Sequence, residues 1–331
     1  MYVDYTQYQP LFTKYGIEDH QIIIDAWNEP HRFYHTEKHL KHLLDHIEQG
    51  GFTDEEKEIL TMVAFMHDVV YQPNRDDNEA QSVAFFEKHT QPTPHTAQIS
   101  QIIHDTKDHQ GSSELSKTFC EMDMDIVHST SFKELWEWEK GLFKEFQCYD
   151  YSLYKQGRIA VLSRFKEKYP QNASNLQALI DYLKPYKPKI GVYPGSFNPF
   201  HNGHLNILEK AEQVFDKVII ARGINPEKET IEKGEALSPV LYYRQIEGFQ
   251  GLLTDYITSK EAHADVTLIR GLRNGDDLAY EMNQLNFMRD MKADLKTVFF
   301  HCDREFEHIS SSAIRNLEKI GKGYGEKYLP E

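Results

Sequence analysis

Apolar residues recur at helical spacing through most of the first 187 positions. Leu40, Leu43, Leu44 and Ile47 follow one another at three- and four-residue intervals, which places them on one face of a helix. The run Thr53-Asp-Glu-Glu56 is typical of a capped helix start, and an apolar stripe continues from it to His67. Further helices are predicted around residues 99–103 and 132–146. This part of the chain therefore predicts an all-helical domain.

The pattern changes near residue 187. Four short strand-like runs, at residues 190–193, 218–221, 266–269 and 297–300, alternate with helical patterns. Such alternation predicts a parallel, doubly wound sheet of the Rossmann-like α/β class. The Pro-interrupted, basic stretch at 184–189 is typical of a linker. We therefore expect a multi-domain protein with an all-α domain at 1–184, a linker at 185–188 and an α/β domain at 189–331.

Composition and charge narrow the class of protein. The 331 residues carry a formal net charge of −15, of which −10 falls in residues 1–189 and −5 in the remainder. Because neither part has a basic stripe, we expect no nucleic-acid partner. No stretch approaches the ~20 apolar residues that span a bilayer, the N-terminus lacks the features of a signal peptide, and the three cysteines are far apart. We expect a cytoplasmic protein that does not enter a membrane.

A His-x-Gly-His motif follows the first predicted strand and its Pro-Gly turn. His201 and His204 stand where the next helix begins. Backbone N–H groups and the helix dipole at such a point receive phosphate, and imidazoles can donate hydrogen bonds to it without adding a permanent charge. The motif alone is equally typical of a helix cap with two surface histidines.

Three more anion-binding elements follow the later strands. Lys228 comes after the second run, Arg270-Gly-Leu-Arg273 after the third, and Ser310-Ser-Ser312 after the fourth. Each alone could be a loop lysine, a surface arginine pair or an ordinary helix cap. Since carboxyl ends of parallel strands form the ligand-binding edge of such sheets, the four elements together predict a phosphate site.

Residues 189–331 resemble the bacterial phosphopantetheine adenylyltransferase family of the nucleotidyltransferase superfamily. The resemblance is carried by Tyr193-Pro-Gly-Ser-Phe-Asn-Pro199, by the His-x-Gly-His motif, by Arg270-Gly-Leu-Arg-Asn274 with Asp277 and Tyr280-Glu-Met282, and by Ile309-Ser-Ser-Ser312. It implies AMP transfer from ATP to 4′-phosphopantetheine, with Mg²⁺, giving dephospho-coenzyme A and pyrophosphate. The acceptor's own phosphate attacks, so no protein nucleophile is needed, and catalysis is positioning and charge stabilisation.

The resemblance also implies roles for individual residues. Catalysis would involve His204, Lys228 and His201. The acceptor would contact Ser196, Phe197, Leu253 and Arg270. ATP would contact Gly195, Ser196, His204, Arg273, Glu281, Ser310, Ser311 and Ser312. The family also implies a homo-oligomer.

Two departures from the family pattern concern the acceptor. The segment between Lys228 and Arg270 is several residues shorter than expected, and Met288 stands where the family usually has Asn. A different phosphate acceptor, such as nicotinamide mononucleotide, therefore remains open. The related family that adenylylates that nucleotide shares the His-x-Gly-His motif but is not expected to carry the stretch from Arg270 to Glu281.

Twelve of the 17 histidines lie before residue 187, some beside acids. His35 and His39 are four residues apart, on one face of a helix. His67-Asp68 ends the apolar stripe, where an unpaired polar group carries a desolvation cost. Asp123 and Asp125 lie downstream among apolar residues. Imidazole and carboxylate ligands together suit a divalent metal with open positions for water and phosphate.

The order His, His-Asp, Asp resembles the all-helical HD superfamily of metal-dependent phosphohydrolases. The runs 30–35 and 66–73, Asn78-Glu79, Thr106 and His109 are similar to a branch of predicted phosphohydrolases. This implies His39, His67, Asp68 and Asp125 as metal ligands, with Asp125 preferred to Asp123 because the second acid of Asp-x-Asp usually aligns with the ligand. It implies His35 as a general acid, and His104 and His109 at substrate phosphate or a second metal. We interpret His42 and His46 as ordinary polar-face residues.

Together these patterns predict a bifunctional enzyme. The substrate of the helical half is open, and Mn, Fe, Mg, Ni and Zn are not distinguished as its metal. A non-catalytic module that binds a ligand and regulates the transferase is the alternative for this half.

Overall fold

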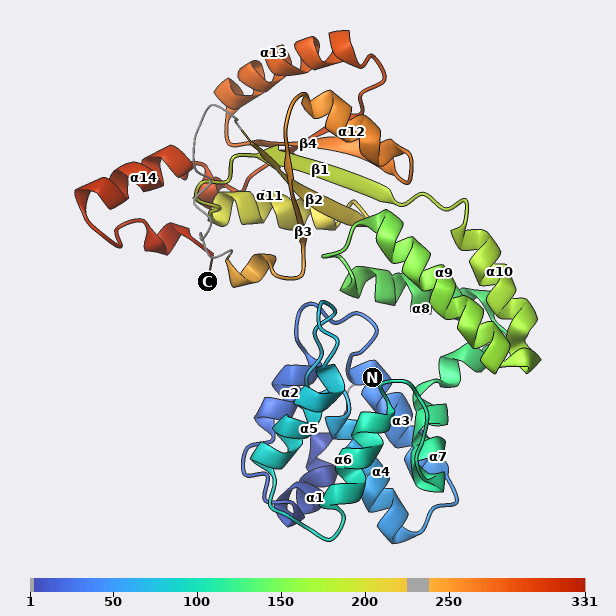
Figure 1. Ribbon diagram of the computed structural model, residues 1–331. Coiled ribbons are helices and arrows are strands. Elements are labelled where there is room, and N and C mark those ends of the chain that lie inside the picture. Colours follow the sequence, from blue (N-terminus) through green and yellow to red (C-terminus); the bar gives the residue numbers. More distant parts are fainter. Residues whose placement is uncertain (1–2, 225–237, 331) are drawn as a thin grey trace. The chain divides into compact units, whose positions relative to one another are not determined.

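The computed structural model describes residues 3–224 and 238–330, and the chain divides into two compact units. Unit 1 comprises Met1–Phe146 and Gly157–Leu183, and unit 2 comprises Gln147–Gln156 and Lys184–Glu331. Figure 1 shows helices in the first and a sheet flanked by helices in the second. The sequence placed residues 147–156 in the helical domain, whereas their contacts group them with the sheet.

Unit 1 is built from helices, as predicted. Its α-helices are α1 (Gln9–Lys14), α2 (Gln21–Trp27), α3 (Glu37–Gln49), α4 (Asp54–Met66), α5 (Asn78–His89), α6 (Thr96–Asp105), α7 (Glu114–Asp123), α8 (Phe132–Glu145) and α10 (Ala173–Leu183). The single-turn helices η1 (Tyr5–Tyr8), η2 (Asp125–His128) and η3 (Pro170–Asn172) connect them. Helix α9 (Tyr151–Lys168) begins in unit 2 and continues into unit 1.

The predicted apolar stripes form the core of unit 1. Leu40, Leu43, Leu44 and Ile47 are all buried on α3. Thr53 and Glu56 form a reciprocal capping box at the start of α4, as the sequence predicts. A second apolar cluster joins α8, α9 and α10 around Leu135, Leu162 and Leu176.

The described residues of unit 2 form a sheet of five parallel strands in the order β3-β2-β1-β4-β5. They are β1 (Lys189–Gly195), β2 (Lys217–Gly223), β3 (Gln245–Phe249), β4 (Asp265–Leu272) and β5 (Thr297–His301). The four predicted strands are confirmed. The edge strand β3 was missed because it lacks a continuous apolar run and contains a glutamate and a glycine.

The helices of unit 2 cover both faces of the sheet. They are α11 (Asn202–Glu212), α12 (Leu253–Glu261), α13 (Gly275–Met291) and α14 (Ser311–Ile320), with the short η4 (Pro239–Leu241), η5 (Arg304–Phe306) and η6 (Glu326–Tyr328). Helix α11 lies on one face, and α12 and α13 lie on the other (Figure 1). The winding direction therefore reverses between β1 and β4, and open α/β sheets bind ligands beside that point.

The segment that precedes α9 covers a buried lysine of unit 2. Nζ of Lys217, at the start of β2, donates to the carbonyl oxygen of Gln147. Burial lowers the pKa of Lys217 to about 7. Lys260 of α12 joins Asp150 to Glu247 through ion pairs of 2.9 and 2.7 Å. Residues 147–156 are therefore an integral part of unit 2.

Among the described residues, no helix is both long enough and apolar enough to cross a membrane.

Gly191 is required for close packing of the central strand. A Cβ at this position would lie 2.3 Å from Cδ1 of Ile269 and 2.9 Å from Cδ2 of Phe215. We expect Gly191→Ala to destabilise unit 2 by about 1–3 kcal/mol, because the core has no room for the methyl group. Gly275→Ala is the matched control, since a Cβ there has no neighbour within 4 Å. Urea unfolding measures both, and equal stability of the two variants would contradict the packing argument.

Candidate functional site

A cavity of about 350 Å³ opens in unit 2 beside the point where the sheet reverses. It is bounded by the carboxyl ends of β1 and β4 and by the first turns of α11, α13 and α14. Its lining includes Gly195, Phe197, His201, His204, Arg270, Arg273, Asp277, Tyr280, Glu281, Ser310 and Ser311. Three of the four anion-binding elements predicted from the sequence therefore meet at one cavity.

His201 and His204 cap α11 reciprocally. The backbone N–H of His204 donates to Nδ1 of His201, and the N–H of His201 donates to Nδ1 of His204, both at 3.3 Å. The two rings stack with their centroids 3.6 Å apart. A Cβ on Gly203 would lie 3.2 Å from the His201 ring, so the small residue lets the imidazole fold back over the helix start. The two histidines therefore cap the helix and also line the cavity, so the two interpretations of this motif are compatible.

The cap fixes the chemical form of both imidazoles. Burial, with a contribution from Arg273, lowers the pKa of His201 to about 4. Burial, with contributions from His201 and Arg273, also holds the pKa of His204 well below its usual range. Both rings are therefore neutral at pH 7, and since each Nδ1 accepts a hydrogen bond, the proton of each ring is on Nε2. Each histidine can offer an uncharged N–H donor to an anion.

The two predicted phosphate-binding arginines are each paired with an acid. Nε of Arg270 lies 2.7 Å from Oε2 of Glu281. Arg273 donates to Asp277 from its backbone N–H, from Nε and from Nη2, at 3.0, 2.8 and 2.8 Å. Glu281, expected to contact ATP, lines the cavity and contacts Arg270. Asp277 lies on the first turn of α13, and Arg273 lies just before the N-cap Asn274, so the carboxylate can reach both the backbone N–H and the side chain of Arg273.

The three serines at the start of α14 make different contacts. Ser310 caps α14 by accepting from the N–H of Ala313 at 3.2 Å. Ser311 donates to the carbonyl oxygen of Pro199 at 3.0 Å, which ties α14 to the loop after β1. Oγ of Ser312 lies 3.4 Å from Oγ of Ser310, and Ser312 is exposed and does not line the cavity.

Two further residues predicted to bind substrate do not line this cavity. Ser196 is exposed and Leu253 begins α12, and neither lines it. Phe197 adopts a left-handed backbone conformation (φ 48°) that folds its buried ring between Gly195 and His204. Lys228 lies outside the described residues.

A second cavity, of about 330 Å³, shares Phe197 with the first. Its walls are mostly apolar and come from the loop after β1, from β2 and β3, from η4 and from the C-terminal residues. They include Phe200, Ile220, Pro239, Leu241, Ile246 and Leu329, with Arg222 as a charged member.

Unit 1 gathers three imidazoles around one carboxylate. Oδ1 of Asp123 lies 2.9 Å from Nε2 of His39 and 3.5 Å from Nε2 of His67. Nε2 of His109 lies 3.1 Å from the other oxygen, Oδ2. Asp68 adds a second carboxylate, with Oδ2 3.3 Å from Nε2 of His67. Histidines and acids singled out from the sequence therefore lie close together, as a group with nitrogen and oxygen ligand atoms.

His67 is oriented in the way that metal-binding histidines are. It is 1% exposed, and its Nδ1 lies 3.1 Å from the carbonyl oxygen of Ala64. That contact places the proton of a neutral ring on Nδ1 and leaves Nε2 with a lone pair. Within the described chain, Nε2 of His67 has no hydrogen-bond partner. Burial would lower the pKa of His67, but Asp68 and Asp123 outweigh it and raise that pKa well above its usual range. A divalent ion would replace the Nε2 proton as the positive charge beside the two carboxylates.

Asp123, and not Asp125, occupies the position predicted for the last ligand. Asp123 ends α7, whereas Asp125 begins η2 and turns its carboxylate towards His42, at 3.2 Å. The two acids of an Asp-x-Asp run thus point to different groups. His104 is exposed on α6 and stands apart from the group that contains His109.

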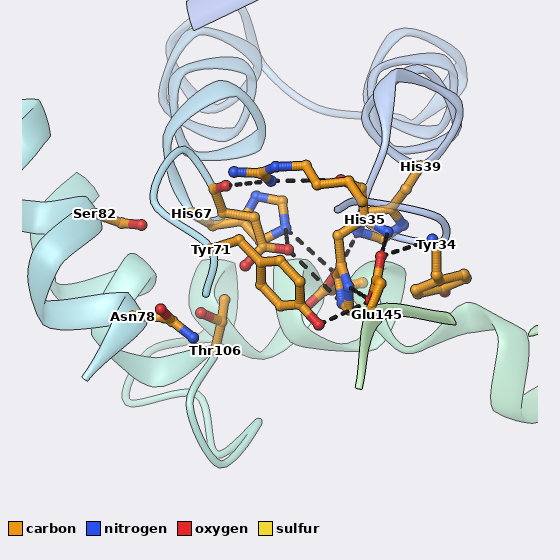
Figure 2. Close-up of polar contacts among 12 residues, drawn as sticks. Tyr34, His35, His39, His67, Tyr71, Asn78, Ser82, Thr106 and Glu145 are labelled. Atoms are coloured by element: carbon orange, nitrogen blue, oxygen red, sulfur yellow. Dashed lines mark hydrogen bonds and ion pairs between the residues drawn. The ribbon is translucent and has the colours of Figure 1, made fainter. Parts of the chain in front are cut away.

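Glu145 is a site residue that the sequence did not reveal. Its fully buried Oε1 accepts from the backbone N–H groups of residues 33, 34 and 35 at 2.7–2.8 Å. Its Oε2 binds Nδ1 of His35 and the hydroxyl of Tyr71, both at 2.8 Å (Figure 2). Burial alone would raise the pKa of Glu145, but His35 and the backbone donors lower it to about 2. Nothing in the charged and aromatic run at the end of α8 distinguishes this glutamate from a surface one.

Glu145 holds His35 at the edge of the site. Nε2 of His35, the ring nitrogen away from Glu145, lies 4.0 Å from Oδ2 of Asp68. Burial would lower the pKa of His35, but Glu145, Asp68 and Asp123 outweigh it and raise the pKa.

Two α5 side chains brace the segment after His67-Asp68. Asn78 exchanges hydrogen bonds with the backbone N–H and carbonyl of Gln72, and Ser82 does the same with Val70. Thr106 donates to the carbonyl oxygen of Ile103 at 2.7 Å. Figure 2 places these three side chains away from Glu145, so they act here as supports of the backbone.

The depressed pKa of His201 predicts a loss of stability on acidification. The unfolded chain binds a proton near pH 6.5 and the folded one only near pH 4, so this stabilisation is present above 6.5 and is lost as the pH falls. We expect the contribution of His201 to fall by about 2 kcal/mol between pH 7 and 5. His201→Asn keeps a capping side chain without titrating, so its pH dependence should be smaller by that amount.

Amide hydrogen exchange in α11 at several urea concentrations measures this difference at the two pH values. His263→Gln, at an exposed position, should keep the full dependence of the original chain. The same pH dependence in His201→Asn and the original chain would contradict the assignment.

Comparison with known proteins concerns unit 2. The cytidylyltransferase-like family model matches residues 192–317. Phosphopantetheine adenylyltransferase of Syntrophomonas wolfei is 36% identical over 144 residues, which are 41% of this chain and 88% of that protein. The proteins of the same name from Clostridium novyi and Alkaliphilus metalliredigens are 32% and 33% identical, over 40% and 43% of this chain and 85% and 93% of their own length.

These relatives are matched over most of their length, and the family model lies wholly within unit 2. The nucleotidyltransferase motifs found in the sequence agree with them. Through its C-terminal unit, the chain belongs to the phosphopantetheine adenylyltransferase family of cytidylyltransferase-like proteins.

Proposed function

We propose that unit 2 transfers AMP from ATP to 4′-phosphopantetheine, a step of coenzyme A biosynthesis. The observation that carries the proposal is the cavity beside the sheet reversal, where two neutral histidines, two arginines and a serine-capped helix start converge. A phosphate oxygen of the acceptor attacks the α-phosphorus of ATP. The bond from the α-phosphorus to the bridging oxygen breaks, and pyrophosphate leaves with the bonding electrons.

His204 stabilises charge on the α-phosphate in the transition state. Its Nε2–H is a fixed, uncharged donor, because Nδ1 is occupied by the cap. A donor that is already oriented needs no reorganisation when negative charge develops. His201 holds the opposite half of the cap and offers a second donor to the ATP phosphates.

The arginines supply positive charge to the substrates. Nε of Arg270 lies 2.7 Å from Oε2 of Glu281, and the terminal nitrogens of Arg270 would bind the acceptor phosphate. Arg273 is held beside the cavity by Asp277 and meets the ATP phosphates together with the start of α14. Mg²⁺ enters with ATP, since this ion binds nucleotide phosphates and keeps several waters. Lys228 belongs to the same proposal on the family motif.

The apolar cavity beside the phosphate site supports 4′-phosphopantetheine as the acceptor. It shares Phe197 with the histidine cavity, so one molecule can place its phosphate in the histidine cavity and a long arm of methyl, methylene and amide groups in the apolar one. A flexible pantetheine arm suits such walls better than the ribose and charged ring of nicotinamide mononucleotide do.

Activity with purified full-length chain tests the assignment. With ATP and Mg²⁺, we expect pyrophosphate release with 4′-phosphopantetheine. His204→Asn should lower kcat by about 10²–10³-fold, as the loss of one oriented donor does elsewhere, with little change in the KM for ATP. His263→Gln should retain full activity, because this histidine is exposed and does not line the cavity.

Pyrophosphate release with nicotinamide mononucleotide and none with 4′-phosphopantetheine would contradict the acceptor. An unchanged kcat in His204→Asn would contradict the role of that histidine.

We propose, as a second function, that unit 1 is a metal-dependent phosphohydrolase. The observation behind this proposal is the buried Nε2 of His67, which lies 3.3 Å from Asp68 and 3.5 Å from Asp123 but has no hydrogen-bond partner in the described chain. The ion would be held by His39, His67, Asp68 and Asp123, and His109 would contact Asp123 beside it. When bound, a divalent ion supplies an activated water and neutralises phosphate charge.

His35 would protonate the leaving oxygen. Its Nδ1 is held by Glu145, so the ring can turn only its Nε2 edge to the site. Glu145 itself contacts no substrate and is a positioning residue.

Asp123→Asn tests the metal site of unit 1. The amide cannot supply the negative charge that pairs with a divalent ion, so phosphate release from a nucleotide and phosphate-ester panel should fall at least about 100-fold. Chelation of metal from the original chain should have the same effect, with recovery on adding Mn²⁺. Asp45→Asn, in an exposed pair with Lys41, should change neither.

A chain that hydrolyses no member of the panel but still binds phosphate compounds would favour the ligand-binding module over the hydrolase. Full hydrolysis by Asp123→Asn would contradict the metal site itself.

A further inference from the structure

Unit 1 holds a second group of metal-ligand side chains that neither proposed activity uses. His42 and His46 lie one turn apart on α3, and Asp125 begins η2. Oδ2 of Asp125 lies 3.2 Å from Nε2 of His42 and 4.0 Å from Nε2 of His46. The two imidazole centroids are 4.3 Å apart. Three donor groups from two separate elements therefore face one point.

The separations suit coordination of one ion. Two ligand atoms, each about 2.0–2.1 Å from a tetrahedral metal ion, lie about 3.4 Å from each other. The contact between His42 and Asp125 is near this value, and all three donor atoms lie within 4.8 Å of one another. A small side-chain rotation of His46 would complete the set.

The chemistry of the ligands indicates the class of ion. Two imidazoles and one carboxylate favour borderline transition metals such as Zn²⁺, whereas Mg²⁺ and Ca²⁺ prefer oxygen ligands. The side chains of His42, His46 and Asp125 are 46%, 40% and 43% exposed, so water can fill the remaining positions. We propose that these three residues bind one divalent ion of the zinc class at the surface of unit 1.

The proposed site at His42, His46 and Asp125 (the outer site) and the buried group around Asp123 use the same supporting elements but different ligands. Helix α3 turns His39 to the buried group and His42 and His46 to the outer one. The run Asp123-Met-Asp125 likewise gives one acid to each. An ion at the outer site would link α3 to η2, two residues beyond Asp123, and so would restrain the backbone that carries a buried ligand.

Zinc stoichiometry of the full-length chain tests this inference, with Zn²⁺ alone as the probe. The double variant His42→Gln/His46→Gln should bind one zinc ion fewer per chain than the original protein, measured by elemental analysis after equilibrium dialysis. His89→Gln, which changes a histidine at the end of α5, should bind the same number as the original. Since the buried group is intact in all three, the difference reports the outer site.

Asp125→Asn provides a second, milder test. Loss of an outer-sphere partner alone costs about 10–100-fold in metal affinity, so loss of a direct ligand should raise the Kd of this one site at least about 100-fold. Melting without metal should be unchanged, because all three side chains are partly exposed. Equal stoichiometry in the original and double variant, or an unchanged Kd in Asp125→Asn, would overturn the proposal. Neither outcome bears on hydrolysis, which uses other residues.

Discussion

A carboxylate can be buried only when donors replace the water it has lost, and this constraint organises unit 1. Glu145 meets it with three consecutive backbone N–H groups, His35 and Tyr71. To do so it joins the end of α8 to the loop before α3 and to the segment after His67-Asp68. Asp123 meets the same requirement with hydrogen bonds from His39 and His109, and His67 lies 3.5 Å away. The two carboxylates thus place the imidazoles in one buried group, and the site follows from the need to satisfy them.

The function proposed for unit 2 poses the opposite problem, because its cavity would have to receive negatively charged substrates. Its parallel strands deliver the loops after β1 and β4 to one edge, and helix starts there present N–H groups. The local cations are restrained by Glu281 and Asp277, so that the cavity is not a broad positive field in an acidic protein. Neutral histidines, fixed in one tautomer by a reciprocal cap, add donors without adding charge.

The sequence predicted the elements of both sites better than their individual contacts. Periodicity located α3 and four of the five strands, because buried faces impose regular spacing. The motif at His201 and His204 was correctly placed beside Arg270 and Ser310, since strand order fixes where those loops meet. The choice between Asp123 and Asp125 depended on where α7 ends and η2 turns, which no spacing rule fixes. Glu145 could not be predicted, because three of its partners are backbone N–H groups more than a hundred residues away, and any residue type supplies such a group.

The burial of Lys217 beneath residues 147–156 has a consequence for how the two halves are joined. The chain enters unit 2 at Gln147, returns to unit 1 within α9 and enters unit 2 again at Lys184. A cut at the apparent linker would leave the sheet domain without the segment that contains Gln147, whose carbonyl accepts from Lys217. The two activities proposed for this chain are therefore interleaved in its connectivity. No single break in the chain leaves both units whole.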